Sequence, residues 1–460
     1  MSDTALSEFV EATATELDIP GVAVGVWVGG KEVFASHGVT SRDNPLPVDA
    51  DTVFLLGSVS KTFTATALMR LAAEGRIDLD SPVRHYVPEL ELADEQAAAE
   101  LTVFNLLNHT AGLGVRLIVE TGDGDDALAG YVARMRELDQ IAPVGARASY
   151  SQAGYNLLGR IIEKVTGLTF EAAVVSLVLE PVGLSNTVYA PADVMVRRFA
   201  VGHNLGADGT LAVARQWKDT RGNNPGGGLA SSVSDQLRWA RFQLGDGRAE
   251  SGFDVLPSDA LARMQEPTVA LKGSTLGDAF GICWFLRAVD GVRTVGHGGS
   301  GNGQFAELLM IPEHAFAITV MSNSGPDDGI LFNQAVARWA LEHYLGVIDR
   351  QPVPLPHDAV RAREVVGDYD IDVMRLTIDS DGEGLTVAVG IKPEIRAASD
   401  TELPPDLSAA GLGLLPDDEY VVTGGGLQGQ RGYFTRDEHG QIVGADLAGR
   451  LFTRAPDAAQ

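Results

Sequence analysis

Apolar and polar positions near the start of the chain follow two different periods. The first apolar residues are spaced three to four positions apart, which predicts an amphipathic helix. They are Leu6, Phe9, Val10, Ala14 and Leu17. Two strand-like runs, 21–28 and 31–36, then flank Gly29 and Gly30. Glycines between two such runs are typical of a hairpin turn, so we expect a β-hairpin here.

The remaining pattern up to residue 350 predicts helices first and strands afterwards. An apolar-periodic stretch ends at Ala73, and a largely helical region runs from about 103 to 244, interrupted by an acidic, glycine-containing segment. Strand patterns return over 281–288, 292–296, 305–311 and 316–322, before a last helix over 333–344. Strands and helices that are segregated in this way indicate an α+β fold. We expect one antiparallel sheet built from both ends of this region, with a helical subdomain inserted between them.

The last hundred residues have a different pattern of apolar and polar positions. A proline-punctuated segment, 351–357, predicts a stiff linker. Beyond residue 358, apolar residues alternate along short runs such as 374–378 and 385–391, with glycine-containing turns between them. This pattern predicts an all-β barrel or sandwich over 358–460. The expected organisation is therefore a domain over 1–350, the linker, and the β domain.

The amino-acid composition limits the classes of binding partner that we expect. The net charge is −27, from 62 acidic against 35 basic residues, so neither nucleic acid nor an anionic membrane surface is an expected partner. No run approaches the roughly 18 apolar residues of a membrane span. The first residues lack the basic and apolar regions of an export signal, which favours a cytoplasmic location. The one cysteine, Cys283, has apolar neighbours and is expected to be a buried structural thiol.

The strongest chemical candidate is Ser58-x-x-Lys61 at the start of the apolar-periodic stretch that ends at Ala73. In a helix, residues three positions apart share a face, so the hydroxyl and the amine could meet. A serine at a helix start also lies beside unpaired backbone N–H groups that favour a developing oxyanion. The alternative is a serine that caps the helix, followed by an exposed lysine.

Three further segments favour the chemical interpretation. Tyr150 comes directly before a predicted helix and, near a lysine, could carry a proton. In 295–301, the glycines would allow a substrate backbone to approach, and the Ser300 N–H could donate into an oxyanion hole. The segment 106–113 is expected to pack beneath the site. No spacing of His, Cys or acidic residues suggests a metal, and we expect no cofactor.

Together these segments resemble the serine β-lactamase and penicillin-binding-protein superfamily, in its class C β-lactamase and D-aminopeptidase branch. The resemblance covers roughly the first three quarters of the chain, with its segments in the family's order. Supporting matches are 18–24, 74–80, 179–184, 226–232 and 280–284. It implies that Ser58 is acylated, that Lys61 and Tyr150 handle protons, and that Gln152, His297, Gly298, Gly299 and Ser300 line the substrate and oxyanion sites. The β domain resembles the lipocalin-like barrel of some D-aminopeptidases and peptide-cyclising relatives.

Two positions depart from the family's pattern. Gln152 stands where most relatives have Asn; its longer amide keeps a donor and an acceptor for Lys61 or a substrate amide. His297 stands where class C β-lactamases have Lys, which argues against a dedicated β-lactamase.

Several functions stay open on this basis. The leading hypothesis is a hydrolase that cleaves amide or ester bonds in a small-molecule or short peptide acyl donor. The second is a transacylase, or a thioesterase or peptide cyclase of natural-product biosynthesis. A β-lactamase and a non-catalytic binding protein are further alternatives, and the oligomeric state is open, with a homo-oligomer as one option. The β domain either stabilises or dimerises the protein, or it reaches over the site.

Overall fold

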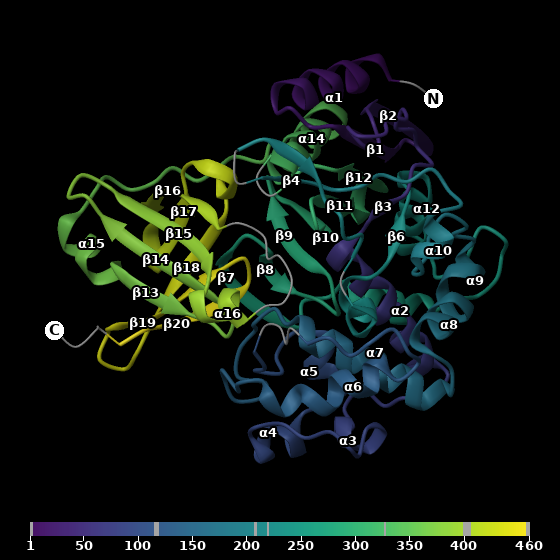
Figure 1. Cartoon of the computed structure of the whole chain (residues 1–460), viewed down its shortest axis with the longest axis horizontal. Helices are drawn as coiled ribbons and strands as arrows, with labels where there is room; N and C mark the ends of the chain where they lie inside the picture. The colour runs from purple at the N-terminus through teal and green to yellow at the C-terminus, as the bar shows by residue number, and fades with distance from the viewer. Residues whose placement is uncertain are drawn as a thin grey trace.

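The computed structural model describes residues 3–114, 119–206, 209–218, 220–325, 328–398 and 406–456. It contains a large mixed body of sheet and helices and, beside it, a separate closed barrel formed by the end of the chain (Figure 1). The α+β class expected from the sequence is confirmed.

The large sheet has eight strands in the order β2-β1-β12-β11-β10-β9-β8-β7, and every neighbouring pair is antiparallel. Its strands are β1 (Gly21–Val28), β2 (Lys31–Gly38), β7 (Val269–Ser274), β8 (Gly277–Phe280), β9 (Phe285–Val289), β10 (Val292–Gly301), β11 (Gln304–Ile311) and β12 (Phe316–Ser322). The sheet is thus built from both ends of the region, as predicted, with the N-terminal hairpin paired to β12.

One predicted strand boundary was wrong. The strand expected over 281–288 begins only at Phe285, because Cys283 has a positive φ of 74° and turns the chain between β8 and β9. Cys283 itself is buried, as expected, and burial raises the pKa of its thiol to about 12.

Helices cover both faces of the sheet. On one face lie α1 (Thr4–Glu16) and α14 (Asp328–Leu345), which bury an apolar layer with β1 and β12. The other face carries α2 (Ser60–Ala73) and α12 (Val233–Leu244), where Trp239 stacks on Phe63 with ring centroids 4.2 Å apart. Trp239 also donates a hydrogen bond to the buried Thr62 hydroxyl, so the two helices are joined by both apolar and polar contacts.

The inserted region beyond α2 consists mainly of helices. They are α3 (Val83–Tyr86), α4 (Glu95–Glu100), α5 (Val103–Leu107), α6 (Ala127–Arg134), α7 (Gln152–Thr166), α8 (Phe170–Val174), α9 (Glu180–Val182), α10 (Pro191–Val194), α11 (Asn224–Gly227) and α13 (Ser258–Met264). Two short pairs of strands accompany them: β3 (Phe54–Leu55), which precedes α2, pairs with β6 (Ala230–Ser231), and β4 (His203–Leu205) pairs with β5 (Leu211–Val213). Within the described ranges, no single helix has both the length and the apolar character to cross a bilayer. Taken together, α7 and the segment 170–182 have that length and apolar character, but they are bent by 77° relative to one another.

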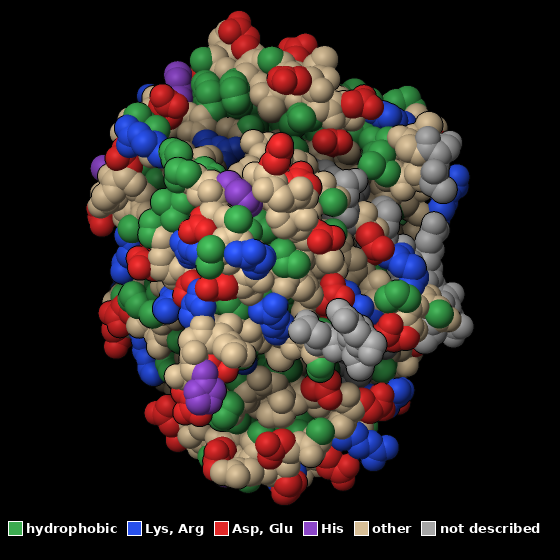
Figure 2. All heavy atoms as spheres, turned by 90° about the vertical axis from the view of Figure 1, so that its left-hand side faces the viewer, with side chains coloured by type: hydrophobic (Ala, Val, Ile, Leu, Met, Phe, Trp, Pro, Cys, Tyr) green, Lys and Arg blue, Asp and Glu red, His purple; other side chains and the backbone are tan. Residues whose placement is uncertain are grey.

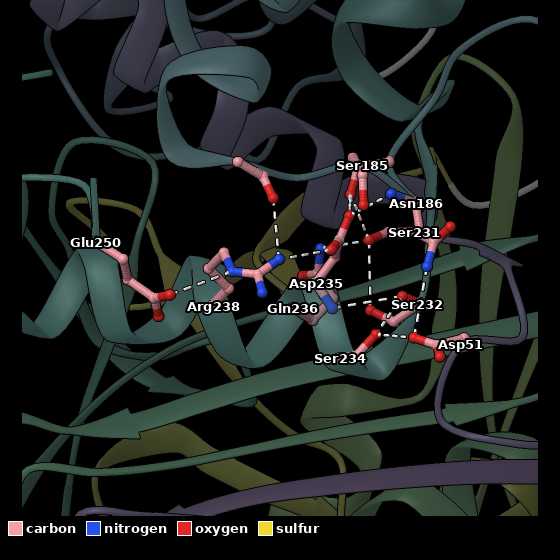
Figure 3. Close-up of polar contacts among 12 residues, drawn as sticks. Asp51, Ser185, Asn186, Ser231, Ser232, Ser234, Asp235, Gln236, Arg238 and Glu250 are labelled. Carbon is pink, nitrogen blue, oxygen red and sulfur yellow. Dashed lines mark hydrogen bonds and ion pairs between the residues drawn. The ribbon is translucent and has the colours of Figure 1, made fainter. Parts of the chain in front are cut away.

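A buried polar network holds the start of α12 in place (Figure 3). Ser232 caps the helix, while the Asp235 carboxylate accepts hydrogen bonds from the Asn186 backbone and the Thr187 hydroxyl at 2.7 and 2.8 Å. Burial raises the pKa of Asp235, and these donors oppose that effect. The contacts tie the loop before α10 to the strand β6 that leads into α12, so we assign this cluster a structural role.

The C-terminal part is a closed barrel of eight antiparallel strands. They are β13 (Gly367–Asp370), β14 (Met374–Ser380), β15 (Leu385–Ile391), β16 (Leu407–Leu414), β17 (Glu419–Val422), β18 (Arg431–Arg436), β19 (Ile442–Leu447) and β20 (Arg450–Arg454). Two helices accompany it, α15 (Ala359–Val365) and α16 (Pro393–Ala398). Buried aromatic rings fill its interior, including Tyr369, Tyr420 and Phe434, and closure gives each of these strands a neighbour on both sides.

Candidate active site

Ser58 lies in a sharp turn between a strand and a helix. β3 leads to Gly57, whose φ of +51° is in the left-handed region, and a single 3-10 turn over Gly57–Val59 runs directly into α2. A Cβ at Gly57 would lie 2.3 Å from the Ser300 carbonyl oxygen, so glycine is required here for both conformation and space. Ser58 is therefore at the start of the helix, as predicted.

Lys61 is one helical turn further on and is fully buried. Its Nζ lies 3.2 Å from Ser58 Oγ and 2.7 Å from the Gly226 carbonyl oxygen, and it also donates to Gln152 Oε1. The alternative of a capping serine followed by an exposed lysine is wrong, because the Ser58 side chain caps no helix N–H and Lys61 points inward.

Gln152, the first residue of α7, is held between Lys61 and a second amide. Its Nε2 donates to Asn223 Oδ1 at 2.6 Å, which leaves Oε1 directed at Lys61. A Cβ at Gly226 would lie 1.8 Å from Gln152 Nε2, so the longer glutamine uses space that only a glycine leaves open. The extra methylene is thus accommodated, and the side chain contacts Lys61 rather than facing the cavity that Ser58 lines.

Tyr150 precedes α7 and packs its ring above Lys61, whose Nζ is 5.0 Å from the ring centroid. Its hydroxyl is buried and has no hydrogen bond of good geometry among the described residues, although Ser58 is near enough to lower its pKa. Burial is the larger effect and raises the pKa of Tyr150 above its ordinary value. Tyr150 therefore keeps its proton at neutral pH.

The loop 106–113 lies beneath Tyr150, as the sequence predicted. His109, with a positive φ of 60°, stacks its ring 4.5 Å from that of Tyr150 and accepts a hydrogen bond on Nδ1 from the Ser151 backbone. Burial and the nearby Lys61 lower its pKa well below the usual range. A neutral His109 thus supports the segment that presents Tyr150.

His297, on β10, is buried. Its Nδ1–H donates to the Gly298 carbonyl at 2.7 Å, and its ring stacks on Phe285 at 4.2 Å. Burial, assisted by Lys61, lowers the pKa of His297 to about 3. The imidazole is therefore neutral, and it does not line the cavity that contains Ser58.

The backbone N–H groups of Ser58 and Ser300 lie near one another. A Cβ at Gly299 would be 2.8 Å from Ser58 N, and one at Gly57 would be 2.5 Å from Ser300 N. Two glycines therefore allow β10 to approach the helix start closely. Ser58 N belongs to the first turn, where an N–H has no acceptor within the helix. This arrangement can bind an oxyanion.

The substrate side of β10 is open beyond Gly296. β9 pairs with β10 only from Val292 to Gly296, and among the described residues no strand pairs with 297–301 on that side. An unpaired strand edge offers backbone donors and acceptors to an extended peptide. Gly298, Gly299 and Ser300 all line the adjoining cavity, whose volume is about 350 Å³.

The barrel forms another wall of this cavity. Residues from the barrel that line it are Gly429, Gln430, Arg431, Ala448 and Arg450. The turn between β19 and β20 contacts the site directly, since the Tyr150 N–H donates to the Gly449 carbonyl at 2.8 Å. The Thr275 and Arg431 backbones are joined nearby by a hydrogen bond of 3.2 Å. Of the two roles considered for the β domain, the structure favours the one in which it reaches the site.

Sequence reasoning missed Arg450, Gly226 and Glu307. Arg450 and Glu307 line the cavity, while Gly226 accepts from Lys61. Gly226 lies in the matched segment 226–232, but its contact with Lys61 was not predicted. No local pattern marks Arg450 or Glu307, because an arginine at the start of a barrel strand and a glutamate in an alternating strand are ordinary residues. Within the described ranges, no group of three or more His, Cys, Asp or Glu is placed to hold a metal.

Comparison with known proteins agrees with this geometry. The family model described as Beta-lactamase matches residues 6–340. Penicillin-binding protein 4 of Amycolatopsis lactamdurans is 34% identical over 322 residues, which cover 69% of this chain and 84% of that protein. Esterase EstB of Burkholderia gladioli is 30% identical over 296 residues, which cover 57% of this chain and 73% of EstB.

A solved structure extends the likeness to the barrel. The crystal structure of SurE with D-Leu superposes with a TM-score of 0.73 and 24% identity, covering 98% of this chain and 99% of SurE. That match shows a common fold through both parts of the molecule. The chain therefore belongs to the beta-lactamase family of serine hydrolases, in which penicillin-binding proteins and esterases are among its relatives.

Proposed function

We propose that the protein is a serine hydrolase that forms an acyl-enzyme on Ser58 and cleaves amide or ester bonds. The observation that carries the proposal is the position of Lys61 Nζ, 3.2 Å from Ser58 Oγ and bonded to Gln152 Oε1 and the Gly226 carbonyl. When its amine is neutral, Lys61 has a lone pair that can accept the Ser58 proton across this 3.2 Å contact.

In this mechanism Lys61 takes the proton of Ser58 while Oγ attacks the carbonyl carbon of the substrate. The oxygen of the tetrahedral intermediate accepts hydrogen bonds from the Ser58 and Ser300 N–H groups. Tyr150, which burial keeps protonated, donates its proton to the leaving group and regains one from Lys61, which had taken it from Ser58. Water then attacks the ester carbonyl and gives a proton to Lys61, which passes it to Ser58 Oγ as the free acid leaves.

A fluorophosphonate probe tests the assignment. We expect one label per chain, mapped to Ser58, and no label on Ser58→Ala. Ser60 and Ser151 are the matched controls: the Ser60 hydroxyl accepts a hydrogen bond from the Leu229 N–H, and Ser151 caps α7. Labelling of either residue in the wild-type protein would contradict the proposal, as would an unlabelled protein that retains its fold.

Acyl transfer is the second candidate, and the barrel wall favours it. A transferase must keep water from the ester and hold an acceptor in line, for which effective molarities can reach ~10⁵ M. The test supplies a thioester donor with and without an acceptor, either millimolar D-leucine or a peptide with a free N-terminus. D-leucine is chosen because the SurE crystal structure is one with D-Leu. If the free acid is the product with every acceptor, the second candidate is wrong and the function is hydrolysis.

A β-lactamase activity remains the third alternative. His297 is neutral and buried, so it supplies no cation for the carboxylate of a β-lactam. We expect slow turnover of nitrocefin relative to a simple ester. Turnover faster than that of every ester tested would instead make β-lactams the substrate class.

A further inference from the structure

The cavity that contains Ser58 continues along the sheet towards the barrel. Beyond Gly298 it is lined by Glu307 of β11, Arg287 of β9 and residues of α14 such as Gln334. Figure 2 views the molecule from the side of the barrel, where acidic and basic side chains are intermixed and the surface is hollowed towards its upper end. Within this cavity the Glu307 carboxylate has no role in the mechanism above.

The register of the sheet brings Glu307 to the open edge of β10. Glu307 pairs with Gly298, so both residues face the same side of the sheet. Gly298 has no side chain, and Glu307 Oε2 lies 3.0 Å from where a Cβ at that position would be. The adjacent Gly299 faces Ser58, so Gly298 and the Glu307 carboxylate lie on the other face of the sheet. The carboxylate reaches across Gly298 towards the open edge of β10, around which the cavity extends to Ser58.

The charge of Glu307 is not compensated within the protein. Among the described residues, none forms a hydrogen bond or an ion pair with its carboxylate. Four arginines line the same cavity. Arg287 pairs with Asp349 at 2.6 Å and Arg431 pairs with Glu419 at 2.9 Å, while Arg450 lies over the Tyr150 ring and Arg338 belongs to α14. A partly buried carboxylate without a cation is costly, and burial raises the pKa of Glu307 to about 7.

We propose that Glu307 binds a cationic group of the substrate, a primary ammonium that lies beside Gly298 when the scissile carbonyl occupies the site at Ser58. The proposal deepens the function proposed above and rests on it. It assigns the substrate class as amine-bearing acyl donors.

The strand geometry limits how far the ammonium lies from the reacting carbonyl. Gly298 and Ser300 are two residues apart, which is about 7 Å along an extended strand. A saturated chain of four to six carbons spans a comparable distance. The ammonium sits either on the acyl group or on the leaving group, since the open edge passes on both sides of the oxyanion site.

Matched ester pairs test the proposal on the whole protein. In the acyl series, p-nitrophenyl 6-aminohexanoate is compared with p-nitrophenyl heptanoate, in which a methyl replaces the ammonium. In the leaving-group series, 6-aminohexyl butanoate is compared with heptyl butanoate. We expect wild-type kcat/KM to favour the ammonium ester by about tenfold or more in one series, as for hydrogen bonds between charged groups. The series that responds identifies the side of the scissile bond.

Glu307→Gln should abolish that preference, so that the ratio of kcat/KM for the ammonium ester to kcat/KM for the methyl ester falls to about one, because the substitution keeps the shape of the side chain and removes the charge. Glu313→Gln, at an exposed carboxylate in the turn after β11, is the matched control and should behave as wild type. Equal rates for the ammonium and methyl esters in both series would overturn the proposal. A preference that survives in Glu307→Gln would do so too.

Binding separates this inference from the proposed function. If no ester acylates Ser58, the hydrolase proposal fails, and hexylammonium is titrated into the protein against 1-hexanol. Saturable hexylammonium binding that is lost in Glu307→Gln, with 1-hexanol unaffected, would support the cation site alone. Absence of such binding would overturn it.

Discussion

The guanidinium of Arg450 lies 5.1 Å from the centre of the Tyr150 ring. Arg450 opens β20 in the barrel, whereas Tyr150 precedes α7 in the inserted helical region, so the contact joins two parts of the chain 300 positions apart. The positive charge lowers the pKa of Tyr150 against the stronger effect of burial. The barrel therefore supplies a charge to the site as well as a wall.

Replacing Arg450 should weaken catalysis. In Arg450→Gln the pKa of Tyr150 rises further and the cation–π contact is lost, so we expect kcat/KM for an activated ester to fall about tenfold. Steady-state kinetics measures the change in kcat/KM. The control is Arg396→Gln, which removes an exposed ion pair of the barrel and should behave as wild type. Unchanged kinetics in Arg450→Gln would show that the charge does not act on Tyr150.

Gly226 and Gln152 should be energetically coupled. Gly226→Ala places a Cβ 1.8 Å from Gln152 Nε2, which displaces the amide from Lys61. We expect the rate of Ser58 acylation to fall at least tenfold. Gln152→Asn shortens the side chain and should recover part of that loss in the double variant, with a coupling energy of about 1–2 kcal/mol. Additive effects of the two substitutions would contradict the shared space.

His297 should not titrate in the working range. Because burial holds the pKa of His297 at about 3, its titration should cause no change in KM for a neutral ester between pH 5 and 8. A KM that rose through pH 6.5 in wild type, but not in His297→Gln, would show instead that a protonated imidazole binds substrate.

The same residue predicts an acid-linked loss of stability. The unfolded chain protonates His297 near pH 6.5 and the folded protein only near pH 3, so its contribution to stability is present above 6.5 and is lost as the pH falls below it. We expect His297→Gln to show a smaller decline in Tm between pH 6.5 and 5 than wild type. An equal or steeper decline would mean that the folded protein accepts the proton.

The turn between β19 and β20 should tolerate no side chain at Gly449. Its φ is +69°, and a Cβ there would lie 2.4 Å from Leu276 Cδ1. We expect Gly449→Ala to lower Tm by a few degrees, consistent with about 1 kcal/mol or more of strain, and to reduce activity through Tyr150. Gly440→Ala is the control, since it is also in a positive-φ turn but has open space around it.

Local sequence patterns were enough to predict that Ser58 and Lys61 lie together at the start of a helix. Ser58 and Lys61 are three residues apart, and helical geometry alone puts residues at that spacing on one face. The hairpin at the start, the helix predicted over 333–344 and the alternation in the barrel strands could likewise be predicted, because each depends on a local period of apolar residues. In the structure that helix begins earlier and spans Asp328–Leu345. Tyr150 was identified through its place before a helix and through the family resemblance.

The residues that surround Ser58 and Lys61 could be known only from the folded chain. Glu307 reaches the cavity because β11 pairs with β10 in a register that sets it opposite Gly298. Arg450 meets Tyr150 because the barrel docks against the turn at Leu276, and His297 is neutral because Phe285 and Lys61 enclose it. These relationships depend on strand register, domain docking and desolvation. All three arise from contacts between segments that are distant in the sequence, so no local pattern of apolar and polar residues predicts them.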